Sequence, residues 1–395
     1  MADSNTVRRR ILTLNNIATA GLERLPREWY EIASEIGHPD AIILRSADMH
    51  SLEIPSTVKA VARAGAGVNN IPLDRLTERG IPVFNAPGAN ANAVKELVIA
   101  GMLLAARNIV QGWDYARGLS GGDEEIHHAV EKGKKQFTGF ELPGKTLGVI
   151  GLGAIGVQVA NAARELGMRV MGFDPQLTVE RAWQLSSDVQ QALSLDELFS
   201  KSDMVTVHVP LIDTTRNTVN AARLALMPKN GVILNFARDG IVDDDAVLEA
   251  LRSGRLHAYV TDFPSARLLA AERVIALPHL GASTLEAEEN CAVMVADNLR
   301  DFLEHGNIRN AVNFPSVKLP RAENSYRIAI ANANVPNMLG QVTTALAKSE
   351  LNILDMINQS KGSVAYTMVD VAAPVPEPTL ETIRSIKGVL NVRAL

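Results

Sequence analysis

The chain has 395 residues, of which 47% are hydrophobic and 21% charged, and its formal net charge is −5. This composition is typical of a globular chain with two or three domains, and the mixed charges exclude the basic surface of a nucleic-acid-binding protein. No apolar run reaches the roughly 18 residues of a membrane span, no apolar core of a signal peptide follows "MADSNTVRRR", and the one cysteine excludes an internal disulfide framework, so we expect a cytoplasmic protein.

Residues 1–97 predict a small α/β domain that binds substrate. Its expected strands are "ILTL", "AIILRS", "VKAVARA" and "IPVFNA", and a long helix from about residue 90 to 107 leads out of it. A second long helix, from about residue 283 to 305, follows the next domain. We therefore expect the first domain to be interrupted and then completed by residues 283–312.

We expect residues 98–282 to form an NAD-binding domain, because from residue 145 to 282 the chain alternates short apolar runs with helical patterns. The runs are "TLGVIGL", "RVMGFD", "MVTVHVP", "GVILNFA", "LHAYVTDF" and "VIALPH". They are rich in Val, Ile and Leu without strict alternation, as expected of strands that are covered on both faces. The pattern predicts a doubly wound parallel sheet, a Rossmann nucleotide domain inserted in the smaller α/β domain.

The last part of the chain has a different rhythm. Residues 313–325 carry two prolines and several polar residues, which is typical of a linker. Residues 326–395 alternate strand and helix patterns in the order βαββαβ, which predicts a ferredoxin-like domain.

The stretch "VIGLGAIG" carries glycines with the spacing of a dinucleotide-binding turn. Gly151 permits a tight turn, Gly153 lets the backbone approach a pyrophosphate, and Gly156 allows the helix to pack closely on the strand. Asp174 ends the next strand, where it can bind ribose hydroxyls and repel a 2′-phosphate, so we expect NAD and not NADP. The alternative is a glycine turn that only packs a helix on a sheet, with Asp174 as a strand-end cap.

Two further strand ends carry residues suited to chemistry. Arg238 can grip a carboxylate bidentately, or it can form a surface ion pair with Asp239 or Asp243. His279 has the side chain best suited to accept and return a hydroxyl proton near neutral pH, or it can cap the helix expected near residue 283. His208 ends a third strand, where it either lines the cofactor crevice or only packs.

The order of these motifs resembles the D-2-hydroxyacid dehydrogenase family. The matching segments are "GKTLGVIGLGAIG", "FDP", "VTVHVPL", "ILNFARDGIVDDDAVLEAL" and "LPHLGAST", and they cover about residues 40 to 300. The C-terminal region resembles an ACT regulatory domain, most clearly in "NANVPNMLGQVTTALAKSELNI". In the usual "N-x-P-G" turn of ACT domains Asn337 replaces glycine, and asparagine tolerates a left-handed backbone.

The resemblance implies NAD-dependent oxidation of a small phosphorylated 2-hydroxy acid, D-3-phosphoglycerate, to 3-phosphohydroxypyruvate, the first step of L-serine biosynthesis. It implies that Arg238 binds the substrate carboxylate and that His279 is the acid–base residue. The cofactor would also contact Ala154, Ile155, His208, Val209, Pro210, Ala237, Arg238, Asp262, His279 and Gly281. The substrate would also contact Arg45, Ser46, Gly65, Gly67, Val68, Asn90 and Lys95, although the glycines can form a plain turn and the charges can be solvated. No metal is expected, since His127 and His128 read as surface residues.

The sequence departs from the family beside the histidine. Most members place a glutamate after the position of Asp262, where it hydrogen-bonds the histidine, but here the positions read Ser265, Ala266 and Arg267. The first carboxylate after Asp262 is Glu272. Either Glu272 takes the role, or His279 works without a carboxylate.

The ACT resemblance implies an amino-acid effector, L-serine, bound by Asn334 and Asn352, in a homo-oligomer. The alternative is an ACT domain that serves only oligomer contacts. Two other functions stay open from the sequence: a dehydrogenase for glycerate, hydroxypyruvate or D-lactate, and a catalytically weak NAD-binding sensor.

Overall fold

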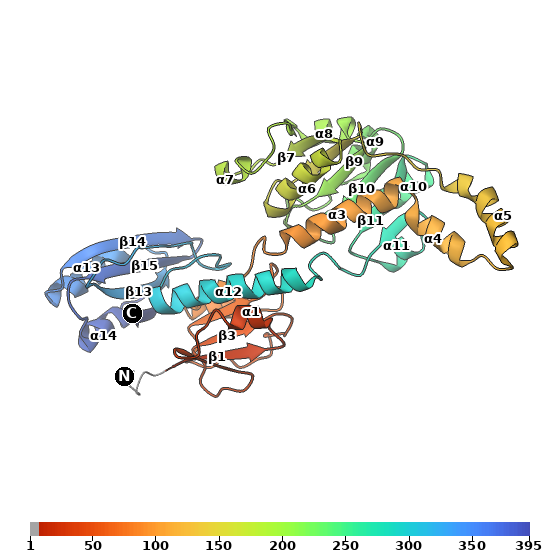
Figure 1. The fold of residues 1–395 in the computed structure, drawn as a ribbon. Helices are drawn as coiled ribbons and strands as arrows, with labels where there is room; N and C mark the ends of the chain where they lie inside the picture. The colour runs from red at the N-terminus through yellow and green to blue at the C-terminus, as the bar shows by residue number, and fades with distance from the viewer. Residues whose placement is uncertain (1–7) are drawn as a thin grey trace. The chain divides into compact units, whose positions relative to one another are not determined.

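The computed structural model describes residues 8–395, so most of the N-terminal stretch considered for a signal peptide lies outside the described residues. The chain divides into two compact units, Met1–Asn90 with Leu285–Leu395, and Ala91–Thr284. The first division comes earlier than the predicted boundary at residue 97, because the long helix that leaves the first sheet belongs wholly to the second unit. Each unit is described by itself below (Figure 1).

The first unit begins with a five-stranded parallel sheet in the order β2-β1-β3-β4-β5. Its strands are β1 (Arg9–Leu14), β2 (Tyr30–Ala33), β3 (Ala41–Leu44), β4 (Ala60–Arg63) and β5 (Val83–Phe84), and its helices are α1 (Thr19–Leu22), α2 (Leu73–Glu78) and α12 (Leu285–His305). Strand β2 was not predicted. Tyr30 is buried there and its hydroxyl donates to Glu304 of α12, so a partner far along the chain stabilises this strand.

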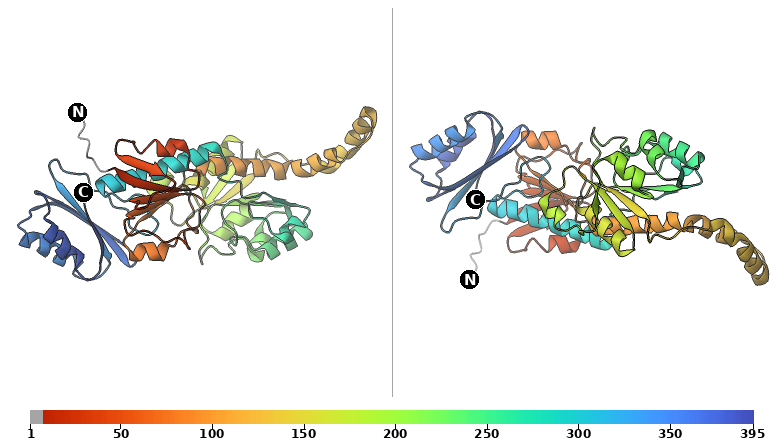
Figure 2. Two further views of the ribbon diagram at one scale, coloured as in Figure 1. Left: turned by 90° about the horizontal axis from the view of Figure 1, so that it is seen from below. Right: turned by 90° about the horizontal axis from the view of Figure 1, so that it is seen from above.

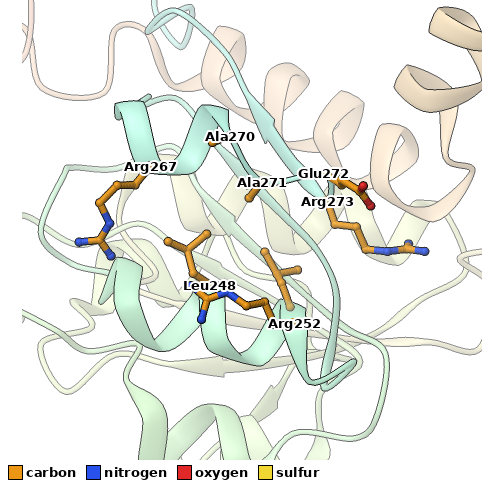
Figure 3. Close-up of a pocket in the computed structure, with 8 residues that line it drawn as sticks. Leu248, Arg252, Arg267, Ala270, Ala271, Glu272 and Arg273 are labelled. Atoms are coloured by element: carbon orange, nitrogen blue, oxygen red, sulfur yellow. The ribbon is translucent and has the colours of Figure 1, made fainter.

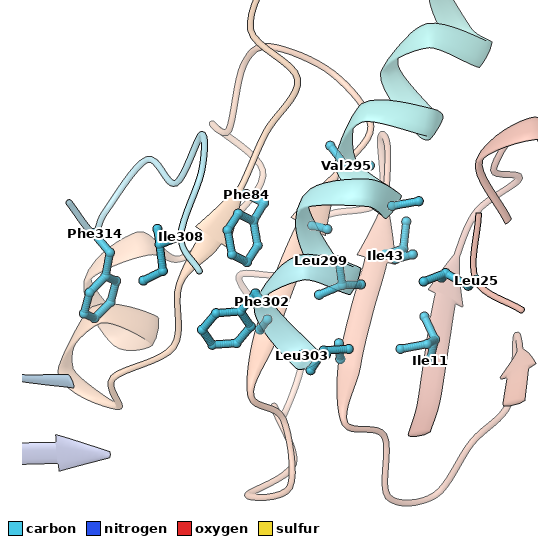
Figure 4. Close-up of a cluster of buried hydrophobic side chains, with 14 of the residues drawn as sticks. Ile11, Leu25, Ile43, Phe84, Val295, Leu299, Phe302, Leu303, Ile308 and Phe314 are labelled. Carbon is cyan, nitrogen blue, oxygen red and sulfur yellow. The ribbon is translucent and has the colours of Figure 1, made fainter. Parts of the chain in front are cut away.

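Helix α12 completes the core of this unit. Its buried side chains pack on strands β1, β3 and β5, and the rings of Phe84 and Phe302 lie 5.5 Å apart between centroids (Figure 4). The segment predicted as a linker takes part in the same core, because Phe314 and Val317 are buried and Val317 forms a β-bridge with Ile308. Residues 313–325 therefore contribute packed structure and not only a connection.

The C-terminal region has the predicted βαββαβ order in an antiparallel sheet, β14-β15-β13-β16. Its elements are β13 (Tyr326–Ala333), α13 (Met338–Lys348), β14 (Ile353–Lys361), β15 (Val364–Val371), α14 (Glu377–Arg384) and β16 (Val389–Ala394). Asn337 precedes α13 with φ of 65°, so the tolerance of asparagine for this turn is confirmed.

This C-terminal region is anchored to the end of α12. The Tyr366 hydroxyl donates to the Gly306 carbonyl at 2.8 Å. Arg327 and Asp370 form a bidentate pair with both side chains 0% exposed, and Arg327 also donates to the His305 carbonyl at 2.9 Å. The guanidinium of Arg393 lies 4.3 Å from the centroid of the Phe302 ring.

The second unit holds a seven-stranded parallel sheet in the order β12-β11-β10-β9-β6-β7-β8. Its strands are β6 (Thr146–Ile150), β7 (Arg169–Phe173), β8 (Gln190–Gln191), β9 (Met204–Val207), β10 (Gly231–Asn235), β11 (Leu256–Thr261) and β12 (Val274–Ala276). Its helices include α3 (Ala91–Ala106), α6 (Ala154–Glu165), α7 (Val179–Ala182), α8 (Leu195–Lys201), α9 (Ala221–Leu226), α10 (Asp244–Arg252) and α11 (Ala266–Leu269). Six of the strands coincide with the six predicted apolar runs, and the short edge strand β8 was missed.

The second unit also carries an arm that the sequence did not predict. It consists of α4 (Ile109–Arg117), α5 (Asp123–Gly133) and the 3₁₀ helix η1 (Lys134–Phe137), and it projects from the end of α3 away from the sheet (Figures 1 and 2). Neither α4 nor α5 has a buried residue. Within residues 8–395, no helix has both the length and the apolar character that crossing a membrane requires.

Candidate functional site

The glycine turn follows β6 and opens α6, as the spacing predicts. Gly151 has φ of 88°, and a Cβ there would lie 2.6 Å from the His208 carbonyl oxygen. A Cβ on Gly156 would lie 1.9 Å from the Gly151 oxygen, whereas a Cβ on Gly153 would meet no atom within 4 Å. Open space therefore lies beside Gly153, at the N-terminus of α6 where Ala154 and Ile155 form the first turn, and a pyrophosphate fits there.

Asp174 joins this turn to the end of β7. Its Oδ2 accepts from the Leu152 amide and its Oδ1 from the Gln176 amide, each at 2.8 Å. The carboxylate is thus held in place by two backbone amides, and its oxygens have lone pairs left for ribose hydroxyls. A pocket of about 530 Å³ adjoins it, whose lining includes Asp174, Leu185, Val189 and Leu193. Sequence reasoning missed the part of this pocket that is lined by β8, because that strand was not predicted.

His208 ends β9 beside the glycine turn. Its Nε2 lies 3.0 Å from Thr206 Oγ1, and its backbone amide donates to the Ile150 carbonyl. Its Nδ1 is buried and has no hydrogen-bond partner among the residues that the structure describes. Burial lowers the pKa of this imidazole to about 3, so His208 is neutral and does not exchange protons near neutral pH. The neighbouring Val209 is half-buried and Pro210 is exposed.

Arg238 follows β10 in a turn shaped by Asn235. The Asn235 side chain accepts from the Ala237 amide and donates to the Arg238 carbonyl. The exposed Arg238 side chain donates to the Ala237 carbonyl at 2.6 Å and forms no ion pair within residues 8–395. The expected surface pairs with Asp239 or Asp243 are therefore not formed, and the guanidinium keeps donors for an anionic ligand.

Asp262 ends β11 and holds the turn that carries His279. Asp262 is 1% exposed, and its carboxylate accepts from the Leu280 and Gly281 amides at 2.8 and 2.9 Å. His279 itself is exposed and has φ of 54°, a backbone conformation that few non-glycine residues adopt. Since α12 begins only at Leu285, His279 does not cap that helix.

The carboxylate expected beside His279 is not found in residues 8–395. Ser265 caps α11 by accepting from the Leu268 amide, and Arg267 pairs with Asp245 of α10. Glu272 lines a surface pocket of about 610 Å³ together with Arg267 and Arg273 (Figure 3), and His279 is not among the residues that line it. The structure gives Glu272 no contact with His279, so the first of the two sequence alternatives is not supported.

The substrate residues predicted in the first unit lie on loops at the carboxyl ends of its strands. Arg45 and Ser46 line a hollow of about 640 Å³ with Asn15 and Asn16, and Arg45 pairs with Glu288 of α12 at 2.6 Å. Arg45 and Ser46 are thus available to bind an anion, with the Glu288 carboxylate beside them.

The glycine turn after β4 is only partly free. The Gly65 amide donates to the Arg63 carbonyl at 2.8 Å, whereas the amides of Gly67 and Val68 have no hydrogen-bond partner within residues 8–395. The two free amides can serve an anion. Asn90 is half-buried just before α3, and in the second unit Lys95 Nζ lies 3.8 Å from Glu96.

The two predicted effector residues lie at opposite ends of β15. The Asn334 amide donates to the Ser363 carbonyl, and the Asn352 carbonyl accepts from the Ala372 amide. At about 3.3 Å per residue the two sites are roughly 25 Å apart or more. No group of metal-binding side chains occurs in residues 8–395, and His127 and His128 are exposed on α5 as predicted.

Comparisons with known proteins agree with this geometry. Residues 99–281 match the family model for the D-isomer specific 2-hydroxyacid dehydrogenase, NAD binding domain. The chain is similar to D-3-phosphoglycerate dehydrogenase of Haemophilus influenzae, with 35% identity over 83% of this chain and 79% of that one. The enzyme of the same name from Methanocaldococcus jannaschii is 35% identical over 83% of this chain but only 61% of its own length. An NAD⁺-bound 3-phosphoglycerate dehydrogenase structure from Entamoeba histolytica covers 78% of this chain and 99% of its own, with 26% identity and a TM-score of 0.60.

Proposed function

Since the chain belongs to the D-isomer-specific 2-hydroxyacid dehydrogenase family and has its NAD-binding domain, we propose that it oxidises D-3-phosphoglycerate to 3-phosphohydroxypyruvate, the first step of L-serine biosynthesis. The relatives named D-3-phosphoglycerate dehydrogenase support the substrate. One observation of the structure carries the chemistry. Arg238, Asp262 and His279 follow three neighbouring strands, β10, β11 and β12, at one edge of the sheet that also holds the glycine turn.

Each residue has one task in this reaction. NAD, which the glycine turn and Asp174 would hold, would supply the hydride acceptor for C2 of the substrate. His279 accepts the proton of the C2 hydroxyl, and the guanidinium of Arg238 donates to the substrate carboxylate and polarises the adjacent carbon–oxygen bond. The free amides of Gly67 and Val68 supply further donors to the carboxylate, and Arg45 binds the phosphate.

The test is a steady-state comparison of D-3-phosphoglycerate with unphosphorylated D-glycerate, following NADH formation. His279→Gln should lower kcat by roughly 10²–10⁴-fold, because it removes the acid–base group. Arg238→Gln should lower kcat/KM by roughly tenfold to a hundredfold, because it removes charge-assisted hydrogen bonds. Arg252→Gln is the matched control, since Arg252 is exposed and, within residues 8–395, forms an ion pair with Glu249 alone.

The same panel decides between the proposal and its rivals. If the phosphate makes no difference to kcat/KM, the enzyme acts on another 2-hydroxy acid, such as glycerate, hydroxypyruvate or D-lactate. If NADH binds without turnover on any 2-hydroxy acid, the chain is an NAD-binding sensor. Phosphate dependence should disappear in Arg45→Gln if that residue binds the phosphate.

We further propose that the protein works as a homo-oligomer that uses the arm. Helices α4 and α5 bury no residue, yet Ile109, Val110, Trp113 and Val130 are exposed apolar side chains on them. Exposed apolar surface of this kind is typical of an interface. Trp113→Glu should lower the oligomeric mass in sedimentation velocity. Trp183→Glu is the control, because Trp183 is 86% exposed outside the arm.

We also propose that L-serine regulates the enzyme at the C-terminal domain. Asn334 and Asn352 lie too far apart in one chain to hold one amino acid, so an effector bound by both needs two chains. L-serine should inhibit wild-type activity, and Asn334→Ala or Asn352→Ala should weaken that inhibition with little change in kcat. If activity does not change up to millimolar L-serine, the proposal fails and the C-terminal domain serves only oligomer contacts.

The proposed location is the cytoplasm. Cys291 is the one cysteine in the sequence, and it is buried in the core of the first unit. Burial raises the pKa of its thiol, which keeps it protonated and unreactive. A free thiol of this kind suits a reducing compartment.

A further inference from the structure

His279 lacks the partner that usually orients a catalytic histidine. A carboxylate beside an imidazole fixes both its position and its tautomer. Within residues 8–395 no carboxylate contacts the His279 ring: both oxygens of Asp262 accept from the Leu280 and Gly281 amides, and Glu272 lines a pocket to which His279 does not contribute. Something else must hold an exposed ring on a left-handed backbone position.

The phenyl ring of Phe263 contacts the His279 ring. The two ring centroids are 5.1 Å apart and the planes are inclined by 62°, an edge arrangement that is favourable for aromatic pairs. Phe263 is half-buried whereas His279 is exposed, so the phenyl ring covers one side of the imidazole. We propose that Phe263 is the positioning residue for His279 and takes the orienting role of a carboxylate.

The backbone on each side of this contact is fixed. The Phe263 amide donates to Thr261 Oγ1 at 3.1 Å, and Thr261 is fully buried. On the other side, the Asp262 carboxylate holds the amides of the two residues that follow His279. Both rings are therefore attached to anchored backbone, and their contact is a property of the fold and not of two free side chains.

The anchor extends to the turn that carries Arg238. On the neighbouring strands β11 and β10, buried Thr261 lies opposite buried Asn235. The Asn235 carbonyl accepts from the Asp262 amide, and its side chain shapes the turn at Arg238. One buried hydrogen-bond network thus joins the carboxylate-binding arginine to the segment that positions the histidine.

An aromatic neighbour has a different chemical consequence from a carboxylate. The phenyl ring restricts where the imidazole can point, but it accepts no hydrogen bond in the plane of a ring nitrogen. Both nitrogens of His279 therefore remain available, one for the substrate hydroxyl and the other for exchange with water. The role in proton transfer rests on the proposed dehydrogenase function, whereas the contact itself does not.

Steady-state kinetics of two Phe263 variants test the role. Phe263→Leu removes the ring and should lower kcat roughly twofold to tenfold, because an aromatic pair contributes that much to ordering the base. KM for NAD should not change, and Phe263→Tyr, which keeps the ring, should restore kcat. Phe140→Leu is the matched control: Phe140 makes the same kind of contact with His257, with centroids 5.7 Å apart, away from the cofactor edge of the sheet. Equal loss of kcat in both leucine variants, or no loss in Phe263→Leu, would overturn the proposal.

A spectroscopic measurement separates this inference from the proposed function. In the proton NMR spectrum of the wild type, the ring resonances that disappear in His279→Gln belong to His279. They should move in Phe263→Leu, because the ring current of the phenyl group is lost, and should stay in place in Phe140→Leu. Resonances that do not move refute the contact even in an active enzyme. Resonances that move in a protein without turnover support the contact while the proposed function fails.

Discussion

Burial of His208 makes the stability of the second unit sensitive to mild acid. Folding lowers the pKa of this imidazole from its ordinary 6.5 to about 3. Below pH 6.5 the imidazole of the unfolded chain binds a proton, whereas that of the folded chain stays neutral until the pH is near 3. The free energy of unfolding therefore falls progressively as the pH drops from 6.5 toward 3, and it does not depend on this group above pH 6.5. At ~1.4 kcal/mol per pH unit, the loss between pH 7.5 and pH 5 is about 2 kcal/mol.

The assay is urea unfolding followed by tryptophan fluorescence. The chain has three tryptophans, and a Trp29→Phe background leaves Trp113 and Trp183, both in the second unit. In that background, acidification from pH 7.5 to pH 5 should lower the free energy of unfolding by about 2 kcal/mol less in His208→Gln than in the protein that keeps His208. The reason is that the variant has no imidazole to protonate at this position.

The control for this measurement is His127→Gln. His127 is exposed on α5, so its replacement should leave the pH dependence of unfolding as it is in the background. The comparison uses the difference between two pH values, which removes any constant cost of the substitution. If His208→Gln loses as much stability as the background on acidification, burial of a neutral His208 is the wrong explanation.

Three other predictions concern single groups of the structure. Arg327→Met should lower the free energy of unfolding of the first unit by roughly 3–5 kcal/mol in urea, because it leaves the Asp370 carboxylate buried and unpaired. Adding Asp370→Leu to this variant should restore most of the lost free energy, because it removes the unpaired charge. Asp262→Ala should lower kcat by roughly tenfold or more, because the turn that carries His279 loses two charge-assisted hydrogen bonds. The kcat of Asp262→Asn should lie between those of the wild type and Asp262→Ala, and equal kcat values in all three proteins would count against this anchor. Asp174→Asn should raise kcat/KM with NADP relative to NAD by about tenfold, since it removes the repulsion of a 2′-phosphate; an unchanged ratio would contradict the assignment.

The nucleotide fold follows from local patterns in the sequence. Six of the seven strands in the second unit coincide with apolar runs, because a strand that is covered on both faces has to be apolar along its length. The glycine turn also follows from spacing alone, since only glycine fits at Gly151 and Gly156, where a Cβ would collide with backbone. Parallel strands bring their carboxyl ends to one edge, so the grouping of Arg238 and His279 was foreseeable.

Other elements depend on partners distant in the chain. Strand β2 exists because Tyr30 packs under α12, and the segment predicted as a linker is folded because Phe314 and Val317 enter the same core. Helices α4 and α5 of the arm have no buried residue, so no packing against a core of this unit marked the arm as structure.

The sequence by itself determined the fold class, the cofactor turn and the identity of the arginine and histidine, because each depends on spacing along a few residues or on strand period. Only the tertiary structure decided what surrounds His279. It places Glu272 and Arg267 around a pocket that His279 does not line and pairs Arg267 with Asp245. It uses both oxygens of Asp262 to hold the turn after the histidine, and it places Phe263 against the imidazole ring. Side-chain direction depends on packing between strand ends that are far apart in sequence, and no local pattern records it.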